Sequence, residues 1–272
     1  MLFFPSKTRS RAAAAAVLLA AALALVGCAA QPLVPRVPPA GGTAAALKPA
    51  ASGNAKAATP GATKSSPAPG AGKTPASVGG KLTIAGALAE IPTKGRAPKT
   101  GYSREQFGPA WSDVDHNGCD TRNDILTRDL GERTYKPGTH ECIVLTGVLN
   151  DPYTGKRIDF ERGVSTSTKV QIDHLVALSN AWQTGAQKLG ADERKALAND
   201  PMNLLAVDGP TNAGKSDGDA ATWLPPQKAF RCSYVARQTA VKLKYGLWMT
   251  QGEKAAISRV AATCPRQTVP AS

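Results

Sequence analysis

The sequence predicts an α+β domain that follows a disordered tail. Ala and Pro crowd the first third of the 272 residues, whereas all four Trp, four of the five Cys and nearly all acidic residues come later. Such a shift in composition is typical of one folded domain behind a tail. In the later part, strand-like and helix-like patterns are mixed without the regular alternation of a parallel sheet. We therefore expect a leader over 1–28, a linker over 29–98 and a folded domain over 99–272.

The leader has the features of an export signal. Residues 7–11 are basic, and residues 12–26 form an apolar run of 15 residues, which suits a signal peptide better than a membrane span. The run ends at Leu25-Val26-Gly27-Cys28, which resembles the bacterial lipobox. This resemblance implies that Cys28 is acylated and anchors the protein to the outer face of the membrane. The alternative is an ordinary cleaved signal and a secreted protein.

The linker carries most of the excess positive charge. Residues 29–80 contain no aromatic residue and many Ala, Pro, Gly, Ser, Thr and Lys, so we expect an extended spacer. Within 81–98, the pattern of Leu82–Ile91 fits a helix or strand that leads into the domain. The net charge is +13, but residues 99–272 hold 22 Lys and Arg against 19 Asp and Glu. The basic tail suits attraction to anionic membrane or wall polymers, or is simply a solvated linker.

The four remaining cysteines predict two disulfides, because an even number in an exported protein usually pairs. Of the three possible pairings we favour Cys119–Cys142 and Cys232–Cys264, since each pair flanks one compact stretch. A zinc site is the rival interpretation, but no CxxC spacing supports it.

Local patterns predict the elements of the domain. We expect helices over 122–130, 180–189, 192–198 and 232–245, the third opened by an Asp cap and the last with Val235, Val241 and Leu243 facing the core. We expect strands over 142–149, 168–175 and 202–207, a short helix or turn over 106–111, and a turn and helix from Asn212. The turn at 151–155 predicts a hairpin.

Three short motifs lie within 43 residues: Asp173-His174, Asn203-Leu204 and Asn212-Ala213-Gly214-Lys215. Cleavage of a phosphodiester requires deprotonation of water and stabilisation of negative charge. A neutral His is the natural base near pH 7, and a carboxylate with an amide oxygen suits a hard cation. Adjacent residues of a strand point to opposite sides, so we expect a bend that lets both Asp173 and His174 reach one phosphate.

This ordered set resembles the HNH nucleases, which have the ββα-metal fold. The stretches IDHLVALSNAW, NDPMNLLAV, TNAGKSD and WLPP are similar to an exported bacterial subgroup with two disulfides. The resemblance covers about residues 100–264. It implies a ββα-metal core with added helices, and a divalent metal, Mg²⁺ or Mn²⁺.

The resemblance also assigns roles. It implies that His174 is the general base, that Asp173 and Asn212 ligate the metal, and that Asn203 holds the loop of the base. Lys215 matches a basic residue near the phosphate. Many relatives have His at the position of Asn212, and Asn favours an oxygen-liganded ion over zinc.

A second cluster follows the spacing of calcium loops. It comprises Asp113, Asp115, Asn117 and Asp124. Asp at the last position in place of Glu, and Cys119 within the loop, depart from that pattern. A polar turn before a helix is the alternative, and Asp120 with Arg122 facing the active site is another. We expect His116 and His140 to be surface residues.

We therefore expect a monomeric metal-dependent endonuclease that acts on DNA, or also RNA, outside the membrane. One competing interpretation is a non-enzymatic surface lipoprotein that binds wall polymer or calcium on a degenerate nuclease fold. Another is a metal phosphodiesterase with a small substrate.

Overall fold

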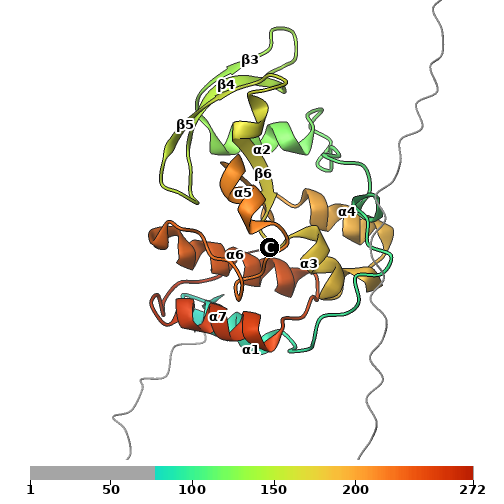
Figure 1. Ribbon diagram of the computed structural model, residues 1–272, viewed down its shortest axis with the longest axis vertical. Coiled ribbons are helices and arrows are strands. Elements are labelled where there is room, and N and C mark those ends of the chain that lie inside the picture. Colours follow the sequence, from blue (N-terminus) through green and yellow to red (C-terminus); the bar gives the residue numbers. More distant parts are fainter. Residues whose placement is uncertain (1–76, 272) are drawn as a thin grey trace, which may run out of the picture. The chain divides into compact units, whose positions relative to one another are not determined.

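The computed structural model describes residues 77–271 (Figure 1). The α-helices are α1 (Ile84–Glu90), α2 (Thr121–Asp129), α3 (Leu178–Gln183), α4 (Ala191–Asn199), α5 (Gly209–Lys215), α6 (Arg231–Lys244) and α7 (Gln251–Ala261). The strands are β1 (Ser77–Val78), β2 (Lys81–Leu82), β3 (Gly131–Tyr135), β4 (Val144–Asn150), β5 (Arg157–Glu161), β6 (Val170–His174) and β7 (Leu204–Asp208). The predicted signal peptide, Cys28 and the linker up to residue 76 lie outside the described residues. Within 77–271, no helix is long and apolar enough to cross a membrane.

The mixture of helices and small antiparallel sheets agrees with the predicted α+β class. Strands β3, β4 and β5 form one sheet in that order, and β6 pairs with β7 in another. Helix α2 contacts both sheets and α5 contacts β6 and β7 (Figure 1). The predicted hairpin is confirmed as β4–β5, where the side chain of Asp151 accepts backbone N–H groups of the turn. Helices α3 and α4 lie in the connection between the paired strands β6 and β7.

Three clusters of buried side chains form the core. The largest lies among α1, α6 and α7, and includes Ile84, Tyr234 and Ile257. A second lies among α3, α4 and the 3-10 turn η1 (Arg104–Phe107), which carries the buried Phe107. The third joins α2 to both sheets. Strand β6 and the residues that follow it contribute to all three clusters, with Ile172 in the third, Leu175 in the first and Val176 in the second.

The predicted boundary of the linker at residue 98 is wrong for its last part. Residues 81–91 form β2 and α1, and Ile84, Ala87, Leu88 and Ile91 are each less than 5% exposed. Thr83 caps α1 by accepting the N–H of Gly86. The apolar pattern of Leu82–Ile91 therefore belongs to the core of the domain, and burial of these side chains outweighs the cost of ordering the chain.

Two predicted helix starts also need correction. Helix α4 begins after Gly190, whose N–H donates to the Glu193 carboxylate, so Asp192 lies inside the first turn and is not the cap. Helix α5 begins at Gly209 and is capped by Asp208, so Asn212 lies within the helix. Helix α7 and strand β3 are absent from the predicted elements; the residues of β3 are mostly exposed and polar, so they lack the apolar alternation typical of a strand.

Both predicted disulfides are confirmed. Cys119 bonds to Cys142 and joins the segment before α2 to the segment before β4. Cys232 bonds to Cys264 and joins the start of α6 to the segment after α7. Val235 and Val241 of α6 face the core as expected, and Leu243 packs against it.

Deletion of residues 77–98 from the full chain should abolish cooperative unfolding. The deletion removes three large buried side chains, and truncation of one such side chain alone costs about 2–5 kcal/mol, against a total stability of about 5–15 kcal/mol. Circular dichroism during heating checks this. Deletion of residues 50–70 is the control and should leave the transition in place. If the chain without residues 77–98 unfolds in the same transition as the full chain, these residues do not belong to the folded domain and the domain begins at residue 99.

Candidate active site

Strand β6 presents Asp173 and His174 at one cavity. In the antiparallel register with β7, Asp173 lies opposite Leu205 and His174 opposite Leu204. Although neighbours on a strand point to opposite sides, β6 ends at His174, and both residues line a cavity of about 510 Å³. Asn212 of α5 lines the same cavity. The structure thus brings together the predicted base and both predicted metal ligands.

The carboxylate of Asp173 is buried and held by two donors. Lys215 Nζ donates to Oδ1 over 2.9 Å, and the Tyr153 hydroxyl donates to Oδ2 over 2.5 Å. Burial raises the pKa of the Asp173 carboxyl, and the Lys215 ammonium acts in the opposite direction. Burial and the nearby Asp173 charge raise the pKa of Tyr153 well above its usual value, so Tyr153 stays a hydrogen donor.

The predicted contact of Lys215 with phosphate is not what the structure shows. Its side chain is fully buried, and Nζ also donates to the backbone oxygen of His174 over 2.8 Å. Lys215 therefore connects α5 to the end of β6 from inside the domain. A charge in this position is needed because a buried carboxylate without a partner is costly.

His174 is held as a neutral imidazole. Its ring is buried, and Nε2 lies 2.9 Å from the backbone oxygen of Ala198. Because a carbonyl oxygen only accepts, Nε2 carries the hydrogen and Nδ1 keeps its lone pair. Burial lowers the pKa of His174 to about 4, which the Ala198 hydrogen bond only partly offsets. The indole of Trp111 stacks near the imidazole, with ring centroids 6.0 Å apart.

Asn203 holds the backbone on both sides of this base. Its Oδ1 accepts the N–H of Val176 over 2.8 Å, and Nδ2 donates to the oxygens of Val176 and Leu197. Val176 follows His174 closely, and Leu197 precedes Ala198, the acceptor for the imidazole. The side chain of Asn203 is fully buried. Asn203 thus contacts the chain on both sides of His174, and the bracing role that the resemblance implies for it stays a prediction.

Asn212 and Asp217 supply further oxygen atoms to the cavity wall. Asn212 Nδ2 donates to Gln171 Oε1 over 2.9 Å. Within residues 77–271, no hydrogen bond uses the side-chain amide oxygen of Asn212, so this oxygen can accept a ligand. Asp217 accepts from the Ser179 hydroxyl over 3.0 Å and from Lys99. Burial tends to raise the pKa of Asp217, but these two donors outweigh it and lower the pKa.

The identities of these donors fit an oxygen-liganded cation. A carboxylate accepts at about four positions, so Asp173 can bind an ion beside Lys215 and Tyr153. The amide oxygen of Asn212 is a neutral hard donor. Within the described range, no three His, Cys, Asp or Glu side chains form a group that could hold a metal ion. Protein side chains of this range would therefore supply only part of the ligands of an ion in this cavity.

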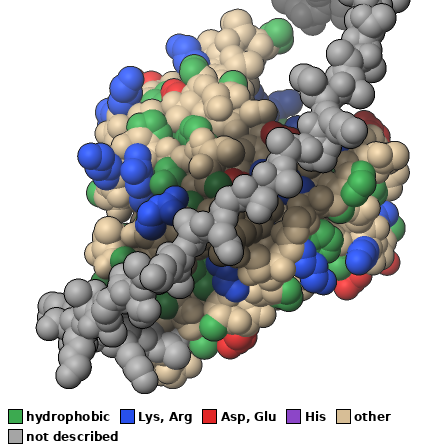
Figure 2. All heavy atoms as spheres, turned by 60° about the horizontal axis from the view of Figure 1, so that its bottom comes forward, with side chains coloured by type: hydrophobic (Ala, Val, Ile, Leu, Met, Phe, Trp, Pro, Cys, Tyr) green, Lys and Arg blue, Asp and Glu red, His purple; other side chains and the backbone are tan. Residues whose placement is uncertain are grey.

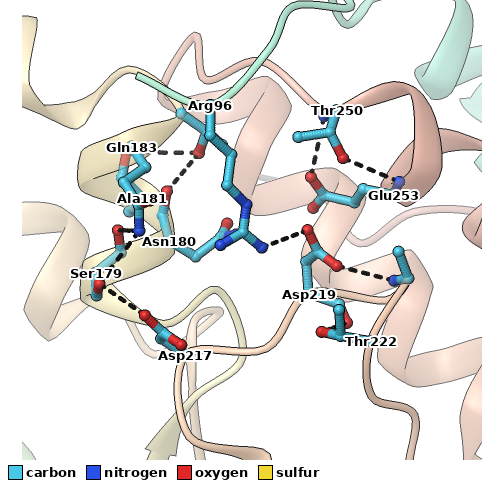
Figure 3. A network of polar contacts seen from close by, with 12 residues as sticks. Arg96, Ser179, Asn180, Ala181, Gln183, Asp217, Asp219, Thr222, Thr250 and Glu253 are labelled. Carbon is cyan, nitrogen blue, oxygen red and sulfur yellow. Dashed lines mark hydrogen bonds and ion pairs between the residues drawn. The ribbon is translucent and has the colours of Figure 1, made fainter. Parts of the chain in front are cut away.

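The segment before η1 borders the cavity and is fixed to its wall. Arg96 forms an ion pair with the buried carboxylate of Asp219 over 2.8 Å, and Ser179 points toward Asp217 (Figure 3). Glu253 lies beside Asp219 in the same view and accepts from the buried Lys242 over 2.7 Å. The N–H of Ala97 also donates to the backbone oxygen of Gln183 in α3, and Lys254 of α7 donates to the backbone oxygen of Ile91. Polar contacts thus connect the segment between α1 and η1 to α3, α7 and the loop after α5.

The predicted calcium loop forms a compact polar turn. Gly118 N–H donates to Asp113, and the Asn117 amide donates to both Asp115 and Asp124. The Oδ1 atom of Asp113 is buried without a hydrogen-bond partner. The four residues are brought together, while Asp120 caps α2. Calcium binding at this loop stays a prediction. His116 and His140 are exposed, as expected.

Several residues of the site were missed in the sequence. Tyr153 stands in a turn that otherwise consists of polar residues and Pro, and an aromatic residue there was the available signal. Asp217 follows Lys215 by two residues and could have been included in the same motif. Trp111 and Arg104 are separated from the motif by more than 60 residues, and no local pattern indicated that they reach His174.

Comparison with known proteins gives two similarities. A family model described as the C-terminal domain of GmrSD restriction endonucleases matches residues 120–260. A protein of Arthroderma benhamiae, described as an uncharacterized secreted protein, is 33% identical over 193 residues, which are 70% of this chain and 89% of that protein. No solved structure matches the chain. The matched range of the family includes Asp173, His174, Asn203, Asn212 and Lys215.

Lys215→Met should destabilise the fold strongly, because it leaves the Asp173 charge buried without its partner. We expect a loss of about 3–5 kcal/mol in the free energy of unfolding, measured by urea denaturation. Lys99→Met is the matched control. The Lys99–Asp217 pair is half exposed, with side chains 55% and 42% accessible, so its loss should cost about 1 kcal/mol or less. Equal effects of the two substitutions would show that Lys215 has no special structural role.

His174 should make the fold sensitive to acid. The unfolded residue has a pKa of about 6.5, and the folded one about 4. Between these values the unfolded chain binds a proton that the folded chain does not, so the contribution is complete above pH 6.5 and is lost as the pH falls toward 4.

We expect this loss to reach about 2–3 kcal/mol between pH 7 and pH 4.5. The free energy of unfolding in urea at the two pH values measures it. His174→Gln should reduce the difference by this amount, whereas His140→Gln, at an exposed position, should not. The same pH difference in all three proteins would mean that His174 is not held neutral by burial.

Proposed function

Because the chain belongs to the family of GmrSD restriction endonuclease C-terminal domains, we propose that it is a metal-dependent endonuclease of the HNH type. Its substrate is nucleic acid, with DNA the first expectation and RNA a second. The family description supports the nuclease activity. The pair β6–β7 followed by α5, with the motif residues at their ends, supports a ββα-metal core.

The single observation that carries this proposal is the state of His174. The hydrogen bond from Nε2 to Ala198 fixes the tautomer, and burial keeps the ring neutral at pH 7. A neutral imidazole with a lone pair on Nδ1 can accept a proton. It lines the same cavity as the oxygen donors Asp173 and Asn212.

The proposed reaction is hydrolysis of a phosphodiester. His174 Nδ1 takes a proton from water while the water oxygen forms a bond to phosphorus. The bond from phosphorus to the leaving oxygen breaks, and this oxygen takes a proton from solvent. The imidazolium then returns its proton to solvent. The Ala198 oxygen accepts from Nε2–H throughout and stabilises the charged ring.

Asp173 and Asn212 would hold the metal ion. Carboxylate and amide oxygens suit Mg²⁺, and Mn²⁺ is an alternative. When bound, such an ion supplies positive charge for the phosphate and the leaving oxygen. Gln171 orients the amide of Asn212, and Lys215 with Tyr153 orients the carboxylate of Asp173. His174 acts as the base and is not a ligand.

The surface charge is compatible with a nucleic acid but does not identify it. On the face drawn in Figure 2, one group of Lys and Arg side chains lies toward the left, others are scattered over the lower right, and acidic side chains are fewer. Residues 99–272 carry a net charge of only +3. We therefore expect binding to depend on contacts at the cavity as well as on general attraction to phosphate.

We also propose that the protein is exported and works as a monomer outside the cell membrane. The basic and apolar leader of residues 7–26 supports export, as does the description of the similar Arthroderma benhamiae protein as secreted. Acylation of Cys28 would anchor the chain to the membrane, and a Cys28→Ser chain would then be released.

In the test of this function, the full chain is incubated with plasmid, with RNA and with a small phosphodiester, each with Mg²⁺ and with a chelator. We expect the plasmid to be cleaved in the presence of Mg²⁺ and not in the presence of the chelator. His174→Ala should lower the rate by about 10²–10⁴-fold, since loss of a general base has this size of effect. Cleavage of the small diester alone would favour a phosphodiesterase, and absence of all cleavage would favour a non-enzymatic lipoprotein.

Calorimetric titration with Mg²⁺ separates the two roles in the same experiment. Asn212→Ala should weaken metal binding, and excess Mg²⁺ should partly restore its activity. His174→Ala should bind the ion nearly as the natural chain does. The reverse pattern would make His174 a ligand and would overturn this assignment of roles.

A further inference from the structure

A second cavity adjoins His174, and Asn212 is not part of its lining. It has a volume of about 720 Å³, within the usual range for ligand pockets. Phe107, Pro109, Ala110 and Trp111 give it a largely apolar lining. His174 also lines this cavity, as it lines the first one. A substrate whose phosphate lies at His174 would therefore have the apolar second cavity next to that phosphate.

Trp111 is held at the boundary of this space. Its indole is half exposed and lies nearly parallel to the imidazole of His174, with an angle of 16° between the rings. Its backbone is in the left-handed region, with φ of 57°, which is a costly conformation for a bulky residue. Such strain persists only where surrounding structure maintains it, and it is common at ligand-binding positions.

Arg104 lines both cavities and is free to bind a ligand. It is exposed, and within residues 77–271 no hydrogen bond or ion pair engages its guanidinium. Guanidinium groups bind phosphate through two parallel hydrogen bonds. A phosphate near His174 would thus meet Arg104, and the nucleoside next to this phosphate would meet the apolar cavity.

We propose that this cavity binds one unstacked nucleobase beside the scissile phosphate, with Trp111 as its stacking surface and Arg104 as the phosphate contact. The inference rests on the proposed nuclease function and narrows its substrate class. A base in a duplex is paired and stacked on both sides, so it must leave the helix to enter the cavity. The preferred substrate is therefore single-stranded or locally unpaired nucleic acid, because its bases are already available to an aromatic surface.

The first experiment compares substrates of one sequence with the full chain in Mg²⁺. They are a single-stranded deoxyoligonucleotide, its duplex, and single strands with one abasic nucleotide placed at successive positions around the cleaved bond. We expect kcat/KM to be at least about 10-fold higher for the single strand than for the duplex. One abasic position should lower kcat/KM by roughly 5- to 150-fold, the usual value of one stacked base.

Variants then locate the base. Trp111→Leu should raise KM for the intact single strand by the same factor as the abasic position does in the natural chain, with little change in kcat. The kcat/KM of this variant should not fall further when the abasic nucleotide is present. Trp111→Phe keeps an aromatic face and should retain most of the affinity. Arg104→Gln should raise KM for all substrates, whereas Arg157→Gln, at an exposed position of β5, should not.

A binding measurement covers the case in which no substrate is cleaved. With chelator present, a single strand that carries 2-aminopurine should lose fluorescence on binding to the natural chain and should keep it with Trp111→Leu. Absence of cleavage with this quenching present would overturn the proposed nuclease function and retain the base site. Cleavage that is equally fast on duplex and single strand and insensitive to abasic nucleotides would overturn the base site alone.

Discussion

The buried ion pair between Lys215 and Asp173 fixes the relation of α5 to β6, and the geometry of the site depends on it. Lys215 reaches both the Asp173 carboxylate and the backbone oxygen of His174, so one ammonium group positions two consecutive residues of the strand. Tyr153 holds the other carboxylate oxygen from the β4–β5 turn. Removing these charges from water is unfavourable, and the close contacts offset much of that cost. As a consequence, the Asp173 carboxylate and the neighbouring His174 are positioned before any ligand binds.

The remaining structure fixes the site from segments that are far apart in the sequence. Asn203 connects the chain after His174 to the last turn of α4, which supplies the acceptor for the imidazole. Arg96, which precedes η1, is joined by an ion pair to Asp219, which follows α5 (Figure 3). Because these contacts are long-range, the site forms only with the complete domain. This explains why α1 and the segment after it belong to the fold although their composition resembles the tail.

The sequence indicated the site residues that stand in short motifs. It did not indicate the residues that are far from these motifs in the sequence and lie near the site only in the folded domain. Asp173, His174, Asn203 and Asn212 stand in short motifs, and the structure brings them to one place. Hairpin β4–β5, helix α6 and both disulfides followed from periodicity and from cysteine number. Whether Lys215 faces substrate or the interior depends on burial, which spacing does not report. Trp111 and Arg104 lie near His174 because of tertiary packing, which no local pattern reports. Strand β3 was also missed, because its residues are polar and exposed and its strand conformation depends on pairing with β4.

The disulfide between Cys119 and Cys142 ties the segment that follows Trp111 to the sheet. Thiols in a reducing compartment stay unpaired, so a newly made chain lacks this link until it meets an oxidant. Before oxidation, the loop from Trp111 to α2 would have more conformational freedom, and Trp111 would be held less firmly beside His174. For an enzyme that attacks nucleic acid, such coupling would delay full competence until the chain has left the compartment that holds its producer's own genome.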